Sequence, residues 1–258
     1  VASRNDSAAG TFVSDGALRF RGGSVNTTKK QTLQRTPGTV GSRSTWTFSA
    51  WFRRGYPDSS PLFGCVATNE SVIQTYIDMI IMRGTTNNSI AGPKMDWAPR
   101  VKDYGNFYHV VMVLDTTNGT DNQRVRYWLN GSREIVINTQ YNTTNWPGQN
   151  YQGGINSAAQ HEIGGRGDGA SIWYDGLMSQ INFIDGQALD ASYFGYTDEL
   201  TGAWRPKKYA NTTASPGDKA GVVGYGTCGF YLPFDGSAPI GKDQSGQGND
   251  WTPFNFGG

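Results

Sequence analysis

The chain has 258 residues, which is enough for one large domain whose core needs neither a metal ion nor a disulfide framework. Its 35 glycines, 13% aromatic residues and only 17% charged residues are typical of a turn-rich β protein. The formal net charge of +1 gives no field that would attract a nucleic acid or an anionic membrane, and no apolar stretch is long enough for membrane insertion.

The cysteines and the N-terminus carry little further information. Cys65 and Cys228 allow one optional disulfide at most, and Cys65 lies in an apolar stretch that favours a buried thiol. The chain lacks an initiator methionine and a secretory signal, which indicates a processed protein or part of a longer one.

Alternation of apolar and polar residues predicts several strands in the first hundred residues. The clearest covers Thr45 to Arg54, where Trp46, Phe48, Ala50 and Phe52 share one face. The sequence from Pro57 to Pro61 predicts a turn. Further strands are predicted at Ala17 to Phe20, Leu62 to Thr68, Thr75 to Arg83 and, more weakly, Met95 to Val101.

The segment from Phe107 to Ile137 holds three predicted strands separated by two turn signals. The first ends at Leu114 and the second covers Arg124 to Leu129. Asn130-Gly131 supplies the two residues with positive φ that a tight type I′ hairpin requires, so the third strand is predicted at Ile135 to Ile137. Together they predict an antiparallel meander.

The next segment, Tyr141 to Ile155, is rich in Asn, Gly and Pro and is predicted to be a long loop, a common place for binding. Strands are predicted at His161 to Gly164 and at Leu177 to Ile184, where Leu177, Ser179, Ile181 and Phe183 would share a face. A helical turn is predicted at Ala188 to Phe194, and a short strand at Phe230 to Phe234.

The composition changes after Tyr196, where Gly, Pro, Lys and Ser dominate. We therefore predict a β-sandwich over residues 1–190 and an irregular C-terminal extension over residues 191–258. This extension is expected to lead to a further domain or to a subunit contact.

Three motifs occur in the order found in a known β-sandwich family. They are TWTFSAWFRR from Thr45, FYHVVMVLD with VRYWLNGSREI from Phe107, and HEIGGRGDGASIWYDGLMSQINFIDGQAL from His161. This pattern resembles the laminin G-like, concanavalin A-like jelly rolls over about Ala17 to Leu189. The resemblance implies an all-β antiparallel jelly-roll sandwich and leaves the ligand open, because one fold hosts many functions.

A second resemblance begins at Phe183. FIDGQALDASYFGYTDELTGAWRPKKY, followed by GTCGFYLPFDGSAPIGKDQSGQGNDWTPFNF, is similar to the segment after the jelly roll in virion proteins of bacteriophages, especially marine ones. Those proteins are of the tail-fibre, capsid-fibre or decoration type. The resemblance implies a place on the virion surface, partners among other virion proteins and copies of itself, and a chain that continues past Gly258.

Catalytic signatures are missing from the sequence. Glycan hydrolases built on the jelly roll carry a Glu-x-Asp-x-x-Glu strand, and none of Glu70, Glu134, Glu162 and Glu199 has Asp two residues later. The two histidines, His109 and His161, have no nucleophile signature beside them. His109 is predicted to pack and hydrogen-bond within its strand, and the protein is predicted not to be an enzyme.

Exposed aromatic rings beside amide or carboxylate groups are the chemistry that binds sugars. Two predicted loops offer it, one with Trp146 and Asn145, and the other with Trp173, Tyr174 and Asp175. These residues are the candidate ligand-binding residues. The alternative is that they are ordinary edge aromatics of a sandwich.

The family resemblance also implies a calcium ion bound by loop carboxylates, for which Asp168 and Asp175 are the nearest candidates. Ordinary loop aspartates are the simpler interpretation, because no dense run of acidic ligands is present. No other cofactor is expected.

Two functional hypotheses follow. The first is a non-enzymatic phage virion protein whose lectin-like domain serves surface adhesion or attachment to a host glycan. The alternative is a free-standing carbohydrate-binding or laminin G-like adhesion domain of a secreted cellular protein. Neither hypothesis includes a nucleic-acid partner.

Overall fold

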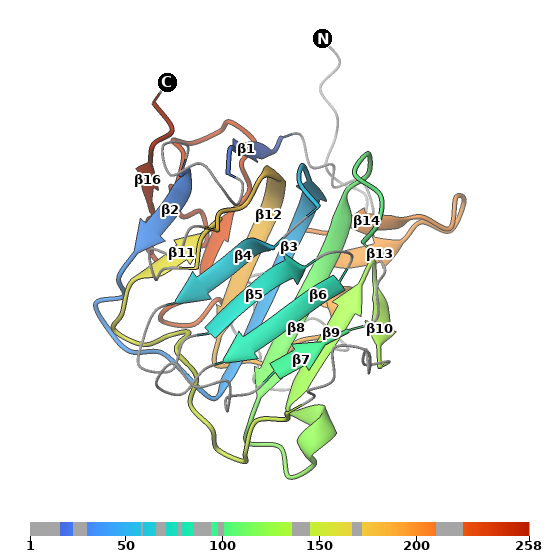
Figure 1. Ribbon diagram of the computed structural model, residues 1–258, viewed down its shortest axis with the longest axis vertical. Helices are drawn as coiled ribbons and strands as arrows, with labels where there is room; N and C mark the ends of the chain where they lie inside the picture. Colours follow the sequence, from blue (N-terminus) through green and yellow to red (C-terminus); the bar gives the residue numbers. More distant parts are fainter. Residues whose placement is uncertain are drawn as a thin grey trace.

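The computed structural model describes residues 16–22, 30–57, 59–65, 71–76, 79–84, 94–97, 101–135, 145–166, 172–209 and 224–257. These residues form two antiparallel sheets that pack face to face (Figure 1). No helix in the described ranges is long and apolar enough to cross a membrane.

The first sheet is built around two ten-residue strands, β12 and β3. Its strands, in spatial order, are β1 (Leu18–Phe20), β12 (Gly176–Asp185), β3 (Thr45–Arg54), β8 (Tyr108–Asp115), β9 (Val125–Leu129) and β10 (Ser132–Glu134). A further strand, β15 (Phe230–Leu232), also pairs with β12. Since β3 occupies one side of β12, β1 and β15 share the other side, at its beginning and its middle respectively.

The second sheet faces the first across the core. Its order is β16 (Thr252–Phe254), β2 (Thr32–Arg35), β11 (His161–Ile163), β4 (Ser60–Cys65), β5 (Ser71–Tyr76), β6 (Met79–Gly84) and β7 (Lys94–Asp96). The remaining elements are a hairpin of β13 (Gly195–Thr197) with β14 (Trp204–Pro206) and the 3₁₀ turns η2 (Asp121–Gln123) and η3 (Ala191–Tyr193).

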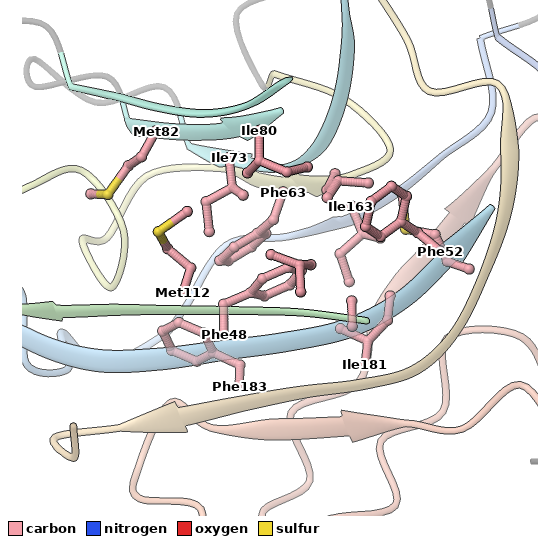
Figure 2. Packing of buried hydrophobic residues seen from close by; sticks show 14 of the residues in the cluster. Phe48, Phe52, Phe63, Ile73, Ile80, Met82, Met112, Ile163, Ile181 and Phe183 are labelled. Atoms are coloured by element: carbon pink, nitrogen blue, oxygen red, sulfur yellow. The ribbon is translucent and has the colours of Figure 1, made fainter. Parts of the chain in front are cut away.

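The core lies between the sheets and is rich in aromatic rings. Figure 2 shows Phe48 and Phe183 of the first sheet pointing toward Phe63 of the second, and the rings of Phe48 and Phe63 stack with centroids 5.3 Å apart. Burial of each such side chain stabilises the fold by about 1.5–3 kcal/mol. The face predicted for the strand at Thr45 to Arg54 is confirmed, since all four of its apolar members are buried.

The meander from Phe107 is confirmed, with one correction at its third strand. Asn130 and Gly131 have φ of 48° and 81°, as a type I′ turn requires. The strand β10 nevertheless begins at Ser132, because a two-residue turn places Ser132 directly opposite Leu129. The prediction at Ile135 to Ile137 was therefore wrong for Ile135, which is 77% exposed; residues 136–137 lie outside the described ranges.

Two boundaries in the second sheet also differ from the prediction. The single strand predicted at Thr75 to Arg83 is two paired strands, β5 and β6, in which Tyr76 lies opposite Met79. No Gly, Pro or Asn marks that reversal. The periodicity of the residues alone therefore predicted one continuous strand. The predicted turn at Pro57 to Pro61 ends earlier, because β4 begins at Ser60 and accommodates Pro61 at an irregular register.

The alternation predicted for Leu177 to Ile184 is interrupted by a bulge. The register of β12 against β3 shifts between Ser179 and Asn182, and Gln180 has φ of 50°. Met178, Ile181 and Phe183 consequently all belong to the main core, and the single face predicted for Leu177, Ser179, Ile181 and Phe183 is not formed.

A second apolar cluster covers part of the outer face of the first sheet. Val111, Val113 and Ile184 of the sheet pack there against residues that follow β12. The contributors from the later chain are Leu189, Ala191, Phe194, Tyr209, Tyr225 and Tyr231. The predicted helical turn at Ala188 to Phe194 is confirmed as η3, in which Asp190 accepts a hydrogen bond from the Ser192 backbone N–H.

The described C-terminal residues differ from an extension that leaves the sandwich. Residues 224–257, called the C-terminal clasp below, add β15 to the first sheet and β16 to the second. Phe230 and Trp251 of the clasp are buried in the main core, where their ring centroids lie 4.8 Å apart. The clasp is thus part of the folded sandwich, whereas a further domain beyond it stays a prediction.

Candidate functional site

The predicted loop with Trp146 lies at the end of the sandwich where η2 is found (Figure 1). Trp146 is half-buried and packs against the main core, and Asn145 beside it is exposed. One side of the loop is therefore anchored by an aromatic ring while its amide side chains face solvent. Residues 141–144 lie outside the described ranges.

Hydrogen bonds that involve its backbone fix this loop to its neighbours. The Asn150 N–H donates to the Thr116 carbonyl at 2.8 Å, and the Thr116 hydroxyl donates to the Tyr151 carbonyl at 2.8 Å. On the far side Nε of Arg43 donates to the Gly153 carbonyl at 2.7 Å. A loop held in this way has already lost much of the conformational entropy that binding would otherwise cost.

Arg124 joins the loop to the turn before β9. Its guanidinium donates to three backbone carbonyls, those of Asn118, Gly119 and Pro147, at 2.9, 3.1 and 2.9 Å. The sequence indicated only a polar strand residue here. No sequence signal marks a side chain whose role is to satisfy carbonyls of two distant loops.

The exposed side chains of this loop are uncharged amides. We call Asn145, Trp146, Gln149, Asn150 and Gln152 the amide rim; its four amide residues are exposed, and Asn150 adopts φ of 62°. Amides both donate and accept hydrogen bonds, as hydroxyl groups do. The rim therefore presents neutral hydrogen-bonding groups beside an immobilised indole, the chemistry expected for a sugar ligand.

The second predicted site does not present its rings to solvent. Tyr174 is fully buried, and its hydroxyl donates to the carbonyls of Arg53 and Leu177 at 2.8 and 3.1 Å. Burial raises the pKa of this hydroxyl. Trp173 is only 4% exposed, with the Lys30 ammonium 5.5 Å from its ring centroid. These two rings are packing residues, because the chain returns into the sheet directly after the loop.

The expected metal ligands are not brought together in the described residues. Asp175 forms an ion pair with Arg19 at 2.6 Å, and Asp168 lies outside the described ranges. No group of three or more His, Cys, Asp or Glu side chains suited to a metal ion occurs in the part of the chain that the structure describes. The residues that are placed do not form a calcium site.

His109 packs and hydrogen-bonds as predicted. Nε1–H of Trp204 donates to its Nδ1 at 2.9 Å, so its Nε2 carries the hydrogen and faces the Ser49 hydroxyl at 2.9 Å. For Ser49 to act as a nucleophile, the hydrogen bond would have to run the other way, with Nε2 accepting the hydroxyl proton. Burial lowers the pKa of His109 to about 3, so the ring is neutral.

Both ring nitrogens of His161 also have hydrogen-bond partners, in this case backbone groups. Its Nε2 accepts the Asn156 N–H at 3.0 Å and its Nδ1 lies 2.8 Å from the Ala159 carbonyl. Burial lowers its pKa to about 4 and raises that of the neighbouring Cys65 thiol to about 11, so the pair holds neither a free base nor a thiolate. Cys65 and Cys228 are both buried and free.

Asp185 is a structural residue that sequence reasoning missed. It is 7% exposed, and its carboxylate accepts hydrogen bonds from the Ser42 N–H, the Asn156 side chain and the Cys228 N–H at 2.8, 2.8 and 3.0 Å. It gathers three segments at the end of the sandwich that carries the amide rim. A strand-terminal Asp gives no sequence signal for this role.

Comparisons with known proteins bear on the fold. No family model and no curated protein matches the chain. A solved structure of a heptameric SAP-like pentraxin from Limulus polyphemus matches with a TM-score of 0.50 and 18% identity, over 69% of this chain and 79% of that one. The fold is a jelly roll. The predicted all-β antiparallel sandwich of the concanavalin A-like, laminin G-like type is thereby confirmed.

Other solved structures are more distant. Domains LG4-5 of the mouse laminin α1 chain match with a TM-score of 0.46 and 10% identity, over 69% of this chain and 44% of that chain. Domain 4 of the extracellular arabinanase AbnA from Geobacillus stearothermophilus, in complex with arabinotriose, matches at 0.40 and 18%, over 58% and 65%. None of these structures bears on the expected virion role.

Proposed function

We propose that this protein is a non-enzymatic, lectin-like adhesion protein that binds a neutral glycan at the amide rim. The observation that carries the proposal is the half-buried Trp146, fixed against the core and flanked by exposed amides on a loop tied down at Thr116, Arg43 and Arg124. A preorganised site of this kind suits a ligand that offers hydroxyl groups and an apolar ring face.

The absence of catalysis is part of the proposal. It is supported by the two histidines, whose ring nitrogens are engaged by Ser49, Trp204, Asn156 and Ala159 and whose buried rings are neutral. A general base needs a free lone pair within reach of a substrate proton, and neither ring offers one.

We further propose that the protein is a structural component on the surface of a bacteriophage virion, where the rim would serve attachment to a host glycan. This step rests on the resemblance of the segment from Phe183 to Phe256. The same segment carries Asn249 and Trp251, which the fold itself uses, so the segment has a structural role in addition to any role in the virion.

A glycan array with matched variants tests the binding proposal. Wild-type protein should bind a limited set of neutral glycans, and Trp146→Ala and Gln149→Ala should each lose at least about tenfold in affinity, since one to two lost contacts cost about 1.4 kcal/mol or more. Gln244→Ala, an exposed amide of the clasp, is the matched control and should bind normally. Unchanged affinity in both rim variants would contradict the proposal that the glycan binds at the amide rim.

Mass spectrometry of purified phage particles tests the virion proposal separately. The chain should be present in stoichiometric amounts in intact virions. Its recovery only among proteins secreted by a cell would favour the alternative of a free-standing adhesion domain.

A further inference from the structure

The described residues cover the outer face of the first sheet only in part at the end opposite the amide rim, where β1 lies in Figure 1. Under the second apolar cluster Val111, Val113 and Ile184 are fully buried, whereas Trp51 and Arg53 of β3 are only half-buried. The outer face of this sheet therefore changes from covered to accessible between its two ends.

The strand register places two arginines and two aromatic rings side by side on this open part. Arg19 lies opposite Leu177, and Leu177 lies opposite Arg53. The Arg53 guanidinium lies over the Phe107 ring, 5.8 Å from its centroid. Trp51 is two residues before Arg53 and so faces the same way. We call Arg19, Trp51, Arg53, Phe107 and Leu177 the arginine shelf.

The Arg53 guanidinium has no ion-pair partner in the described part of the chain. Its side chain has a ring contact with Phe107 and no hydrogen bond or ion pair in the described part of the chain. Arg19, by contrast, is neutralised by Asp175 at 2.6 Å. A half-buried guanidinium with five unused donors favours a planar anion such as a carboxylate, which it can bind with two parallel hydrogen bonds.

Trp51 is held rigidly beside Arg53. Its ring stacks on His109 with centroids 4.8 Å apart, and the Trp204 ring centroid lies 6.0 Å from that of His109. His109 is itself fixed by Ser49 and Trp204, as described above. The exposed part of the indole is thus a fixed apolar surface, on which a ring can stack at little entropic cost.

We infer that the arginine shelf binds an acidic saccharide, with a sugar ring on Trp51 or Phe107 and its carboxylate on Arg53. A guanidinium alone would accept any anion, but two ring faces beside it select an anion that carries a flat apolar face of its own. This site is separate from the amide rim and does not depend on the function proposed for it.

Isothermal titration calorimetry at low ionic strength tests the inference with a defined probe. Tetragalacturonate should bind the wild-type protein at least about tenfold more tightly than the same oligosaccharide with its carboxylates methyl-esterified, because esterification removes the charge that Arg53 recognises. Arg53→Gln should abolish this preference, and Arg53→Lys should retain part of it. Trp51→Ala should weaken both forms of the probe.

Controls keep the outcome interpretable. Arg21→Gln, at an exposed arginine off the shelf, should bind as the wild type does, and near-UV circular dichroism should confirm that each variant is folded. The inference is overturned if the wild type does not bind tetragalacturonate, if Arg53→Gln keeps the preference, or if tetraglutamate binds equally well. Loss of tetragalacturonate binding in Trp146→Ala but not in Arg53→Gln would place the ligand at the amide rim instead. That result would contradict the inference about the shelf and not the proposed function.

Discussion

Two irregular regions of the molecule, the loop at residues 145–155 and the C-terminal clasp, have similar compositions and opposite roles. Both are rich in Gly, Asn, Gln and Pro, and both are held by hydrogen bonds from side chains to the backbone. The loop directs its amides to solvent, whereas the clasp directs Phe230 and Trp251 into the core and completes both sheets.

The clasp shows how polar residues can make irregular backbone rigid. The buried carboxylate of Asp243 accepts hydrogen bonds from the N–H groups of Tyr231, Ser245 and Asn249 and from the Ser245 hydroxyl. The Asn249 side chain then donates to the Gly229 carbonyl at 2.7 Å and accepts from Arg35 of β2. Low hydrophobicity therefore does not distinguish a surface loop from a structural segment.

The largest expected effect is the loss of Trp251. Trp251→Ala should lower the free energy of unfolding by about 3–5 kcal/mol, because it removes a large buried ring and leaves a cavity beside Phe63 and Phe230. Urea unfolding followed by circular dichroism measures this. A loss below about 1 kcal/mol would mean that the clasp is not part of the cooperative core.

The next effect concerns the polar centre of the clasp. Asp243→Ala should cost about 2–4 kcal/mol, because it leaves three backbone N–H groups and one hydroxyl without their acceptor. The matched control is Asp235→Ala, whose exposed carboxylate accepts from Ser237 alone among the described residues, and it should cost less than about 1 kcal/mol. Equal costs for the two variants would contradict the structural role of Asp243.

Acidification should act on the two buried histidines, which lie outside the clasp. The folded-state pKa values of His109 and His161, about 3 and about 4, lie below the value of about 6.5 expected in an unfolded chain. The unfolded chain therefore binds more protons below pH about 6.5, and stability is lost as the pH falls from there toward 4. The loss should reach up to about 2–3 kcal/mol at pH about 5.5.

This pH dependence can be assigned by substitution. His109→Gln removes one of the two titrating groups, so the slope of unfolding free energy against pH between 7 and about 5.5 should fall by about half. Urea unfolding at several pH values gives the slope directly. A wild-type protein with constant stability over this range would show that the histidines are not buried in the neutral form.

The smallest expected effect on stability is at the amide rim. Asn145→Ala and Gln149→Ala should each change the free energy of unfolding by less than about 0.5 kcal/mol, as is usual for exposed side chains. Thermal unfolding measures this. Losses comparable to that of Asp243→Ala would mean that the rim amides mainly support the fold.

The sequence predicted what periodicity and turn chemistry determine. The strand at Thr45 to Arg54 and the Asn130-Gly131 hairpin could be predicted, because each sequence pattern favours a single local backbone structure. The reversal between β5 and β6 and the bulge in β12 were not visible, since no glycine or proline marks either one.

The candidate site was only partly predictable for a different reason. Trp146 and Trp173 look alike in sequence, and their exposure depends on where the following chain goes. Arg124, Asp185 and Asp243 form hydrogen bonds with segments that are distant in sequence. A local sequence pattern cannot predict which distant segment will lie beside a residue.

The most direct test of the account is the affinity of Trp146→Ala for the glycan that the wild type binds best, measured by titration calorimetry beside its thermal stability. We expect a loss of at least about tenfold in affinity while the protein stays folded, with a lower unfolding temperature because a half-buried ring that packs against the core is lost. An unchanged affinity in the folded variant would show that the amide rim is not the glycan site.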